Sequence, residues 1–218
     1  MTSRAAAPAT ATERLRAGTR VWHDALEATP FASAMVGGTL PLDRYVAQLA
    51  AYRVVLETLE GELSRTVSPS VASVWSPDLA KLPLIESDLR YFAASGTAPK
   101  TGAAQAAEAA EAFAREIRRT AASDPQTLLG FLYVLEGSTL GGLILRQYVT
   151  RAYGLGDADG VAYYGSGDRD RWARFTARMN RAVTEPEAQD RVVDAAGRAY
   201  HHTATIAQAL SVGLTGRA

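Results

Sequence analysis

Four polar residues near the N-terminus have types and spacing that could support binding chemistry. They stand at i, i+4, i+7 and i+11, so in a helix they would share one face: Arg16, Arg20, His23 and Glu27. An imidazole can ligate a metal ion, and guanidinium groups match carboxylates in shape and charge. Taken alone, such residues are more often a packed or surface histidine beside a solvated charged face.

A second unusual stretch, residues 128–148, is almost wholly apolar yet contains Gly137, Gly141 and Gly142. Its apolar residues surround the helix axis, which predicts a central, buried helix. Each glycine costs about 1 kcal/mol relative to Ala in a helix interior. Glycines there would let the backbone approach something large and flat, such as a bound ring. Close helix packing or an early helix end are the alternatives.

The sequence lacks several other residue patterns that are typical of metal sites or catalytic sites. No Asp or Glu stands three residues before His23, His201 or His202, so the Glu-x-x-His pairs of di-iron helical proteins are absent. The adjacent His201 and His202 would point about 100° apart on a helix, which makes a poor joint metal site. The glycine cluster follows a helical pattern rather than a strand, which argues against a phosphate loop and against Ser138 as a hydrolase nucleophile.

The composition limits the class of protein. At 218 residues the chain suits one domain, and its net charge of zero predicts no nucleic-acid partner and no anionic membrane surface. With no Cys there is no disulfide, thiolate nucleophile or iron–sulfur cluster. No apolar run approaches the roughly 18 residues that span a bilayer, and no apolar signal core opens the chain. We therefore expect a cytoplasmic protein.

Helical periodicity predicts an all-α, single-domain bundle with about seven helices and no confident strand. Residues 1–11 are rich in Ala, Thr and Pro and are expected to be disordered, so the domain spans 12–213. Thr39 and Pro41 suggest an N-cap and a first-turn proline. The Ala-rich segment 103–122 favours helix while burying little. The expected helices cover residues 12–28, 41–65, 84–94, 103–122, 125–154, 168–183 and 186–210.

A haem placed between the first helix and the glycine-bearing helix would use each of these features. Neutral imidazole is a good axial ligand for haem iron, and Arg matches the propionate carboxylates. The glycine backbone would leave room for O₂ and water beside the iron.

The sequence resembles the bacterial haem oxygenases, in particular the type associated with phytochromes. Residues 15–27 with His23, the motif LYVLEGSTLGG at 132–142, and Arg178-Met179-Asn180 followed by the Pro186 helix carry the resemblance, which extends from about 15 to 210. It implies a haem oxygenase-like bundle in which haem is sandwiched between a proximal first helix and a distal glycine-bearing helix.

The resemblance also implies roles for individual residues. His23 would be the proximal iron ligand, Arg16 would bind a propionate, and Glu27 would be the carboxylate four residues after the histidine. Arg20 and Arg178 are further candidate propionate partners. The distal glycines fall on Gly137, Gly141 and Gly142.

One position departs from the mammalian members, which carry Asp directly after the first distal glycine. This chain has Ser138 there, as the phytochrome-linked bacterial members do. The group that orders the distal water is therefore left open between Ser138, a neighbouring backbone carbonyl and a water chain that reaches an Arg.

By the same resemblance, haem b would be both cofactor and substrate, and its iron would be held by the protein. O₂ and electrons from a donor such as ferredoxin with its reductase would convert it to biliverdin, CO and Fe²⁺. The IXα isomer is the commoner product, and a bacteriophytochrome is one candidate recipient. Two alternatives remain: a haem carrier or sensor that does not degrade its ligand, and a similar helical domain without haem, such as a regulatory or thiamin-degrading relative.

Overall fold

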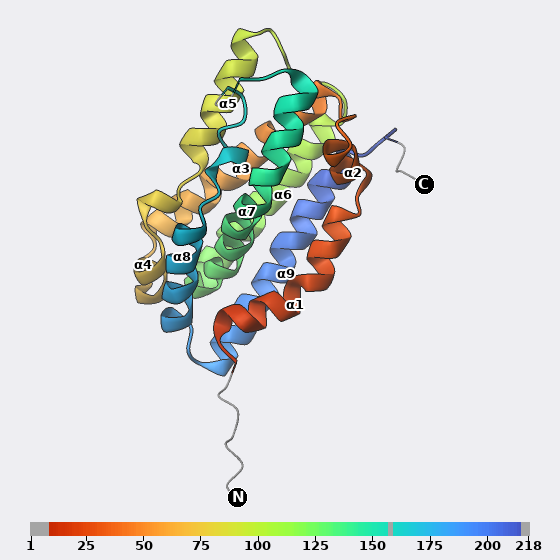
Figure 1. Cartoon of the computed structure of the whole chain (residues 1–218). Coiled ribbons are helices and arrows are strands. Elements are labelled where there is room, and N and C mark those ends of the chain that lie inside the picture. Colours follow the sequence, from red (N-terminus) through yellow and green to blue (C-terminus); the bar gives the residue numbers. More distant parts are fainter. Residues whose placement is uncertain (1–8, 157–158, 215–218) are drawn as a thin grey trace, which may run out of the picture.

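The computed structural model describes residues 9–156 and 159–214, and in this part the chain forms nine α-helices, three short 3-10 turns and no strand. The predicted all-α class is confirmed, and about seven helices was an underestimate. Figure 1 shows the bundle, in which α1 and α9 lie side by side. The α-helices are α1 (Ala11–Glu27), α2 (Pro30–Val36), α3 (Leu42–Arg65), α4 (Pro69–Val74), α5 (Leu82–Ala94), α6 (Ala103–Ser123), α7 (Leu128–Tyr153), α8 (Arg169–Ala182) and α9 (Pro186–Ala209). The 3-10 turns are η1 (Pro77–Leu79), η2 (Pro125–Thr127) and η3 (Tyr164–Ser166).

The helices that periodicity missed are α2 and α4, with seven and six residues. Elements this short contain less than two full turns, so they show no repeat to detect. Both begin with a proline, and the Thr29 side chain caps α2 by accepting a hydrogen bond from the Ala32 amide at 3.2 Å. The loops expected at these positions therefore contain additional helix.

Two helix starts differ from the sequence-based prediction. Helix α1 is capped by Thr10, whose hydroxyl accepts from the Glu13 amide at 3.4 Å while the Glu13 carboxylate accepts from the Thr10 amide at 2.7 Å. This capping box starts the helix at Ala11, one residue before Thr12. Residues 1–8 of the segment expected to be disordered lie outside the described residues. At α3, Pro41 is itself the N-cap and makes no side-chain cap hydrogen bond.

Helix α6 is a core helix, so the expectation that it buries little was wrong. It packs against α3 and α9. Small side chains each remove little surface from water, but they let two helix axes approach closely, and the few large residues between them then become fully buried. The buried face of α6 consists of Ala106, Ala109, Ala110, Phe113, Ala114, Ile117 and Thr120.

Helix α7 is the central helix that the sequence predicted. Its first nine residues, 128–136, are all buried, and it ends at Gly154, whose φ of 63° is the left-handed cap typical of glycine. With the preceding turn, Pro125–Tyr153 is long and apolar enough to cross a membrane by length and composition, with a mean hydropathy of 1.7 in its best window. The sequence-based statement on apolar runs missed this helix. Because 61% of that window is buried inside the bundle, its apolar character belongs to the core.

Two glycines bring α1 and α7 close to the same point of α9. A Cβ atom on Gly18 of α1 would lie 2.7 Å from Cγ1 of Val193. A Cβ atom on Gly130 of α7 would overlap the backbone carbonyl of Val192. Helix α1 therefore contacts α9 at Val193, and α7 contacts it at the preceding residue, Val192. These contacts fix the relative position of the two helices that carry the predicted site.

Candidate functional site

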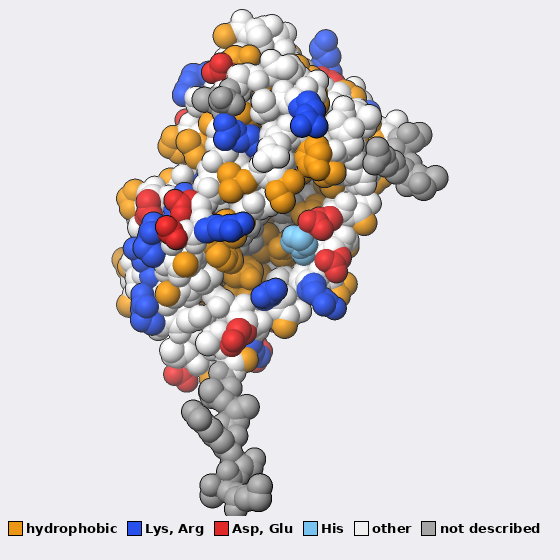
Figure 2. Space-filling model, viewed as in Figure 1, with side chains coloured by type: hydrophobic (Ala, Val, Ile, Leu, Met, Phe, Trp, Pro, Cys, Tyr) orange, Lys and Arg blue, Asp and Glu red, His pale blue; other side chains and the backbone are white. Residues whose placement is uncertain are grey.

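A cavity of about 880 Å³ separates α1 from α7, a volume within the range of about 300–1,000 Å³ typical of small-molecule and cofactor sites. Figure 2 shows this face as a hollow with hydrophobic side chains inside and charged side chains and a histidine at its border. Helices α2, α3, α8 and α9 close the remaining sides. The structure thus brings together the two elements that the sequence singled out.

The α1 wall carries the predicted polar face, and all four of its residues line the cavity: Arg16, Arg20, His23 and Glu27. The His23 side chain is 51% exposed, with Nε2 3.6 Å from Glu27 Oε1 and Nδ1 3.8 Å from Asp24 Oδ1. Both distances exceed hydrogen-bond length. The imidazole therefore remains available as a ligand, and its ring is supported by an edge contact with Tyr200 at 6.1 Å between centroids.

The three predicted glycines of α7 have different surroundings. No atom lies within 4 Å of the position where a Gly141 Cβ would be, and Gly141 faces the cavity. Gly137 also lines the cavity, and its Cβ would lie 3.2 Å from the Trp172 ring. Gly142 is buried outside the lining, where a Cβ would lie 3.1 Å from the Tyr164 carbonyl oxygen. Gly141 therefore borders open space in the cavity, whereas packing explains Gly142.

Neutral hydroxyl groups gather along the distal wall beside Ser138. The Ser138 Oγ donates to the Leu135 carbonyl at 2.8 Å. Tyr163 lines the cavity next to it, and burial raises the pKa of Tyr163, an effect that a hydrogen bond with Ser138 opposes. Burial also raises the pKa of Tyr52 to about 12, and the Tyr164 hydroxyl donates to Gln48 Oε1 at 2.7 Å. At neutral pH these groups are uncharged and can orient a water molecule.

One arginine and two tyrosines line the cavity near α1: Arg16, Tyr133 and Tyr200. Burial raises the pKa of Tyr133 on α7, and the positive charge of Arg16 acts in the opposite direction. Burial likewise raises the pKa of Tyr200 on α9 to about 12, with smaller contributions from Tyr133 and Glu27. The guanidinium of Arg16 and two protonated phenols are thus available to an anionic group that enters between α1 and α7.

Arg178 lies away from this cavity and does not line it. Its Nη1 donates to the Ser76 hydroxyl at 2.8 Å, beside Asp78, whose pKa is lowered first by the Ser76 hydrogen bond and less by Arg178. The histidines of α9 are also separate: His201 is exposed, and His202 stacks on Phe113 at 4.9 Å between ring centroids. Of the three arginines predicted to bind propionates, only Arg16 and Arg20 line the cavity.

Several lining residues were not predicted from the sequence. They are mostly aromatic residues in otherwise apolar segments, where periodicity indicates core packing. The adjacent tyrosines in the irregular segment before α8 were the available signal, because two phenols in a loop need hydrogen-bond partners. These residues are Gln48, Tyr52, Tyr133, Tyr163, Tyr164, Trp172 and Tyr200.

A family model described as Heme oxygenase matches residues 9–209. The chain belongs to the haem oxygenase family. It is an oxidoreductase of that family, as the sequence predicted. Heme oxygenase 1 of Nostoc sp. is 28% identical over 193 residues, which cover 86% of this chain and 80% of that protein. Heme oxygenase 2 of Oryctolagus cuniculus is 25% identical over 89% of this chain and 64% of its own length.

Solved structures of haem oxygenases share the fold. Heme oxygenase-1 from Synechocystis sp., a complex with heme, has a TM-score of 0.83 at 22% identity and covers 94% of both chains. The haem oxygenase from Leptospira interrogans has a TM-score of 0.81 at 23% identity, covering 92% of this chain and 99% of the other. These similarities establish the haem oxygenase-like bundle.

Proposed function

We propose that this member of the haem oxygenase family degrades haem b to biliverdin, CO and Fe²⁺ in the cavity between α1 and α7. The observation that supports this most directly is the juxtaposition of an unobstructed imidazole, His23, with the bare backbone of Gly141 across that cavity. A flat ring needs these two walls, one to hold its metal and one that comes close without side chains.

On the proximal side, His23 would hold the iron through a ring nitrogen. The carboxylates of Asp24 and Glu27 lie beyond hydrogen-bond distance of the imidazole, so neither strengthens its electron donation through a hydrogen bond. Strong electron donation from the axial ligand favours O–O cleavage, which is the wrong outcome for ring oxygenation. Arg16 and Arg20 would bind the propionates at the α1 side of the cavity.

On the distal side, Gly137 and Gly141 exclude bulky acid–base side chains, while Ser138 and Tyr163 can hold a water molecule. Haem, once bound, supplies the O₂-binding and redox chemistry. The role of Ser138 would be to accept a hydrogen bond from that water, because its own proton is committed to the Leu135 carbonyl. Tyr163, whose hydroxyl hydrogen-bonds with Ser138, would accept a second hydrogen bond from the same water.

The finer parts of the proposal concern partners and location. Electrons would come from a ferredoxin with its reductase, and the Arg-bearing rim of the cavity is a suitable docking point for an acidic donor. The enzyme would work in the cytoplasm, open the ring chiefly at the α-meso carbon, and supply its product to a bacteriophytochrome.

The test is to add hemin to the purified protein, supply a ferredoxin system in air, and record the visible spectrum. We expect a Soret band that forms with one equivalent and then decays as a broad biliverdin absorption grows. A Soret band that forms and persists would identify a haem carrier or sensor instead. Failure to form any band would remove haem from the function altogether.

A further inference from the structure

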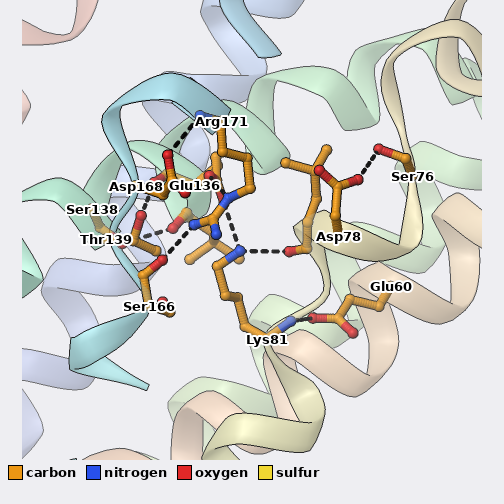
Figure 3. Close-up of polar contacts among 12 residues, drawn as sticks. Glu60, Ser76, Asp78, Lys81, Glu136, Ser138, Thr139, Ser166, Asp168 and Arg171 are labelled. Carbon is orange, nitrogen blue, oxygen red and sulfur yellow. Dashed lines mark hydrogen bonds and ion pairs between the residues drawn. The ribbon is translucent and has the colours of Figure 1, made fainter. Parts of the chain in front are cut away.

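A cluster of three charges, two buried and one partly buried, lies next to the cavity-facing part of α7 (Figure 3). The Glu136 side chain is 1% exposed, with its Oε2 2.7 Å from Lys81 Nζ and its Oε1 2.8 Å from Arg171 Nε. Lys81 is the N-cap residue of α5, and Arg171 lies in the first turn of α8. Three elements far apart in the sequence are therefore joined through one carboxylate of the distal helix.

Further hydrogen bonds hold both cations in place. Lys81 Nζ donates to the Leu79 carbonyl at 2.7 Å, and Arg171 Nη2 donates to the Ser166 carbonyl at 2.6 Å. The Glu60 carboxylate on α3 accepts from the Lys81 amide at 2.7 Å. Burial lowers the pKa of Lys81, while the charge of Glu136 raises it. The cluster thus has little freedom to rearrange, because each member is fixed at a second point.

The cluster lies directly behind the cavity wall. Glu136 is followed in the chain by Gly137 and Ser138, which line the cavity, whereas Glu136 does not. Arg171 is followed by Trp172, whose ring faces Gly137. A change in the cluster would therefore move the cavity wall from both α7 and α8.

Stability alone gives a poor reason for such a cluster, since apolar residues of similar volume often replace buried ion pairs without loss. The glycines nearby supply another reason. A helix segment that contains Gly137 has few side-chain contacts to fix its rotation and height, whereas a buried carboxylate held between two cations has few acceptable geometries. We propose that Glu136, held by Lys81 and Arg171, is a positioning residue that sets the Gly137–Ser138 segment against the haem. This inference rests on the proposed function, because it takes haem as the occupant of the cavity.

The experiment separates positioning from stability with three variants, Glu136→Gln, Glu136→Leu and the double variant Lys81→Met with Glu136→Leu. For each we would measure the thermal unfolding midpoint of the haem-free protein, the hemin dissociation constant, and the electron paramagnetic resonance spectrum of the ferric complex. Glu136→Leu should lower the midpoint, because it leaves Lys81 buried without its carboxylate. The double variant should recover most of it, because the buried Lys81 charge is removed too and the remaining cation, Arg171, is partly exposed to water.

The hemin complex should not recover in the double variant. We expect it to bind hemin at least tenfold more weakly than the wild type and to show an altered ratio of high-spin to low-spin iron. Glu136→Gln, which keeps the volume, should change the same ratio with a smaller loss of affinity. If the double variant and Glu136→Gln both match the wild-type affinity and spectrum, the cluster serves folding alone and the inference is overturned.

A matched control is the ion pair between Arg191 Nε and Asp124 Oδ2, which has the same 2.8 Å distance but lies at the surface. Asp124→Asn should leave the hemin complex unchanged. The proposed function is tested separately by the wild-type protein: if it binds no hemin, haem is not the occupant and that proposal fails. If the wild type binds hemin and the variants do so identically, only the positioning inference fails.

Discussion

The two walls of the cavity are built in opposite ways. The α1 wall consists of side chains on a half-exposed helix face, with His23 and Glu27 among them. The α7 wall consists of backbone from a buried helix, shaped by Gly137 and Gly141 and supported from behind by Glu136. The α1 wall therefore acts through its side chains. The α7 wall acts through the absence of side chains on its surface and through the residues packed behind it.

This difference predicts how each wall responds to mutation. Removing a side chain from α1 should abolish a specific interaction with the ligand and leave the fold intact, because surface substitutions change stability little. Adding a side chain to α7 should obstruct either the ligand or a neighbouring element, depending on which way the glycine faces. The following four predictions test that contrast, beginning with the largest effect.

Replacing His23 with Ala should abolish turnover and the Soret band of the His-ligated complex, because no other imidazole lines the described cavity. The unfolding midpoint of the haem-free protein should stay within a few degrees of wild type. Absorption spectroscopy of the hemin complex, with and without added imidazole, provides the measurement, and imidazole should restore the band. His201→Ala is the matched control, because His201 is exposed on α9. Full activity of His23→Ala without imidazole would contradict the assignment.

Leu substitutions at Gly141 and Gly142 should separate the two kinds of glycine on α7. Gly141→Leu should weaken hemin binding at least tenfold while keeping the fold, because the space it fills is open cavity and Gly is about 1 kcal/mol worse than other residues in a helix. Gly142→Leu should instead destabilise the protein by about 1–3 kcal/mol through overpacking against Tyr164. Hemin titration and urea denaturation of both variants give the comparison. Equal hemin affinity of Gly141→Leu and wild type would assign Gly141 to helix packing.

Arg16→Ala should weaken hemin binding by a smaller factor, about threefold to tenfold, because the side chain is exposed and water would screen its proposed ion pair with a propionate. The loss should shrink as salt is added, since screening weakens the wild-type interaction too. Hemin titrations at two ionic strengths measure this. Arg53→Ala serves as the control, because Arg53 pairs with Glu57 on α3 outside the cavity. A salt-independent loss would point to packing rather than charge.

The smallest effect on hemin binding is expected from Asp88, which does not line the cavity but holds the backbone next to Tyr163, which does. Its carboxylate accepts the Ala162 and Tyr163 amides at 2.7 and 2.8 Å, and burial raises its pKa to about 6, which those amides oppose. The folded state therefore holds this proton more tightly than the unfolded chain. The contribution of Asp88 to stability is complete below pH 4 and falls by at most about 3 kcal/mol as the pH rises through 6.

Denaturation of the wild type and Asp88→Asn between pH 4 and 7 checks this sign. The stability advantage of the wild type over Asp88→Asn should decrease as the pH rises through that range. A constant difference across the range would mean that Asp88 does not titrate there in the folded protein.

The contrast between the walls also explains what could be predicted from the sequence. The face of α1 was predictable, because helical spacing alone places Arg16 and His23 together. The all-α class followed from periodicity in the same way, as did the bounds of the long helices to within a few residues. Helices α2 and α4 were not predictable, because they are too short to show a repeat.

The distal wall was predicted only in outline. Composition showed that the glycines needed an explanation, but only tertiary packing shows that Gly141 faces open space while Gly142 packs on Tyr164. Arg178 illustrates the same limit: its motif suggested a propionate partner, and the fold directs its guanidinium to Ser76. Likewise, Glu136 is one charge in an apolar run, and its partners Lys81 and Arg171 are distant in the sequence.

The glycine contacts on α9 have a mechanical consequence. Gly18 of α1 and Gly130 of α7 contact the consecutive residues Val193 and Val192, and the cavity-lining residues of α7 all lie on the C-terminal side of its contact point. The two walls are therefore held together at one level of α9, and on α7 the cavity lies entirely beyond that level. If the cavity widens to admit a flat ligand or to release a product, we expect the parts of α1 and α7 around Glu27 and Gly141 to move relative to each other, while the contacts with α9 stay in place.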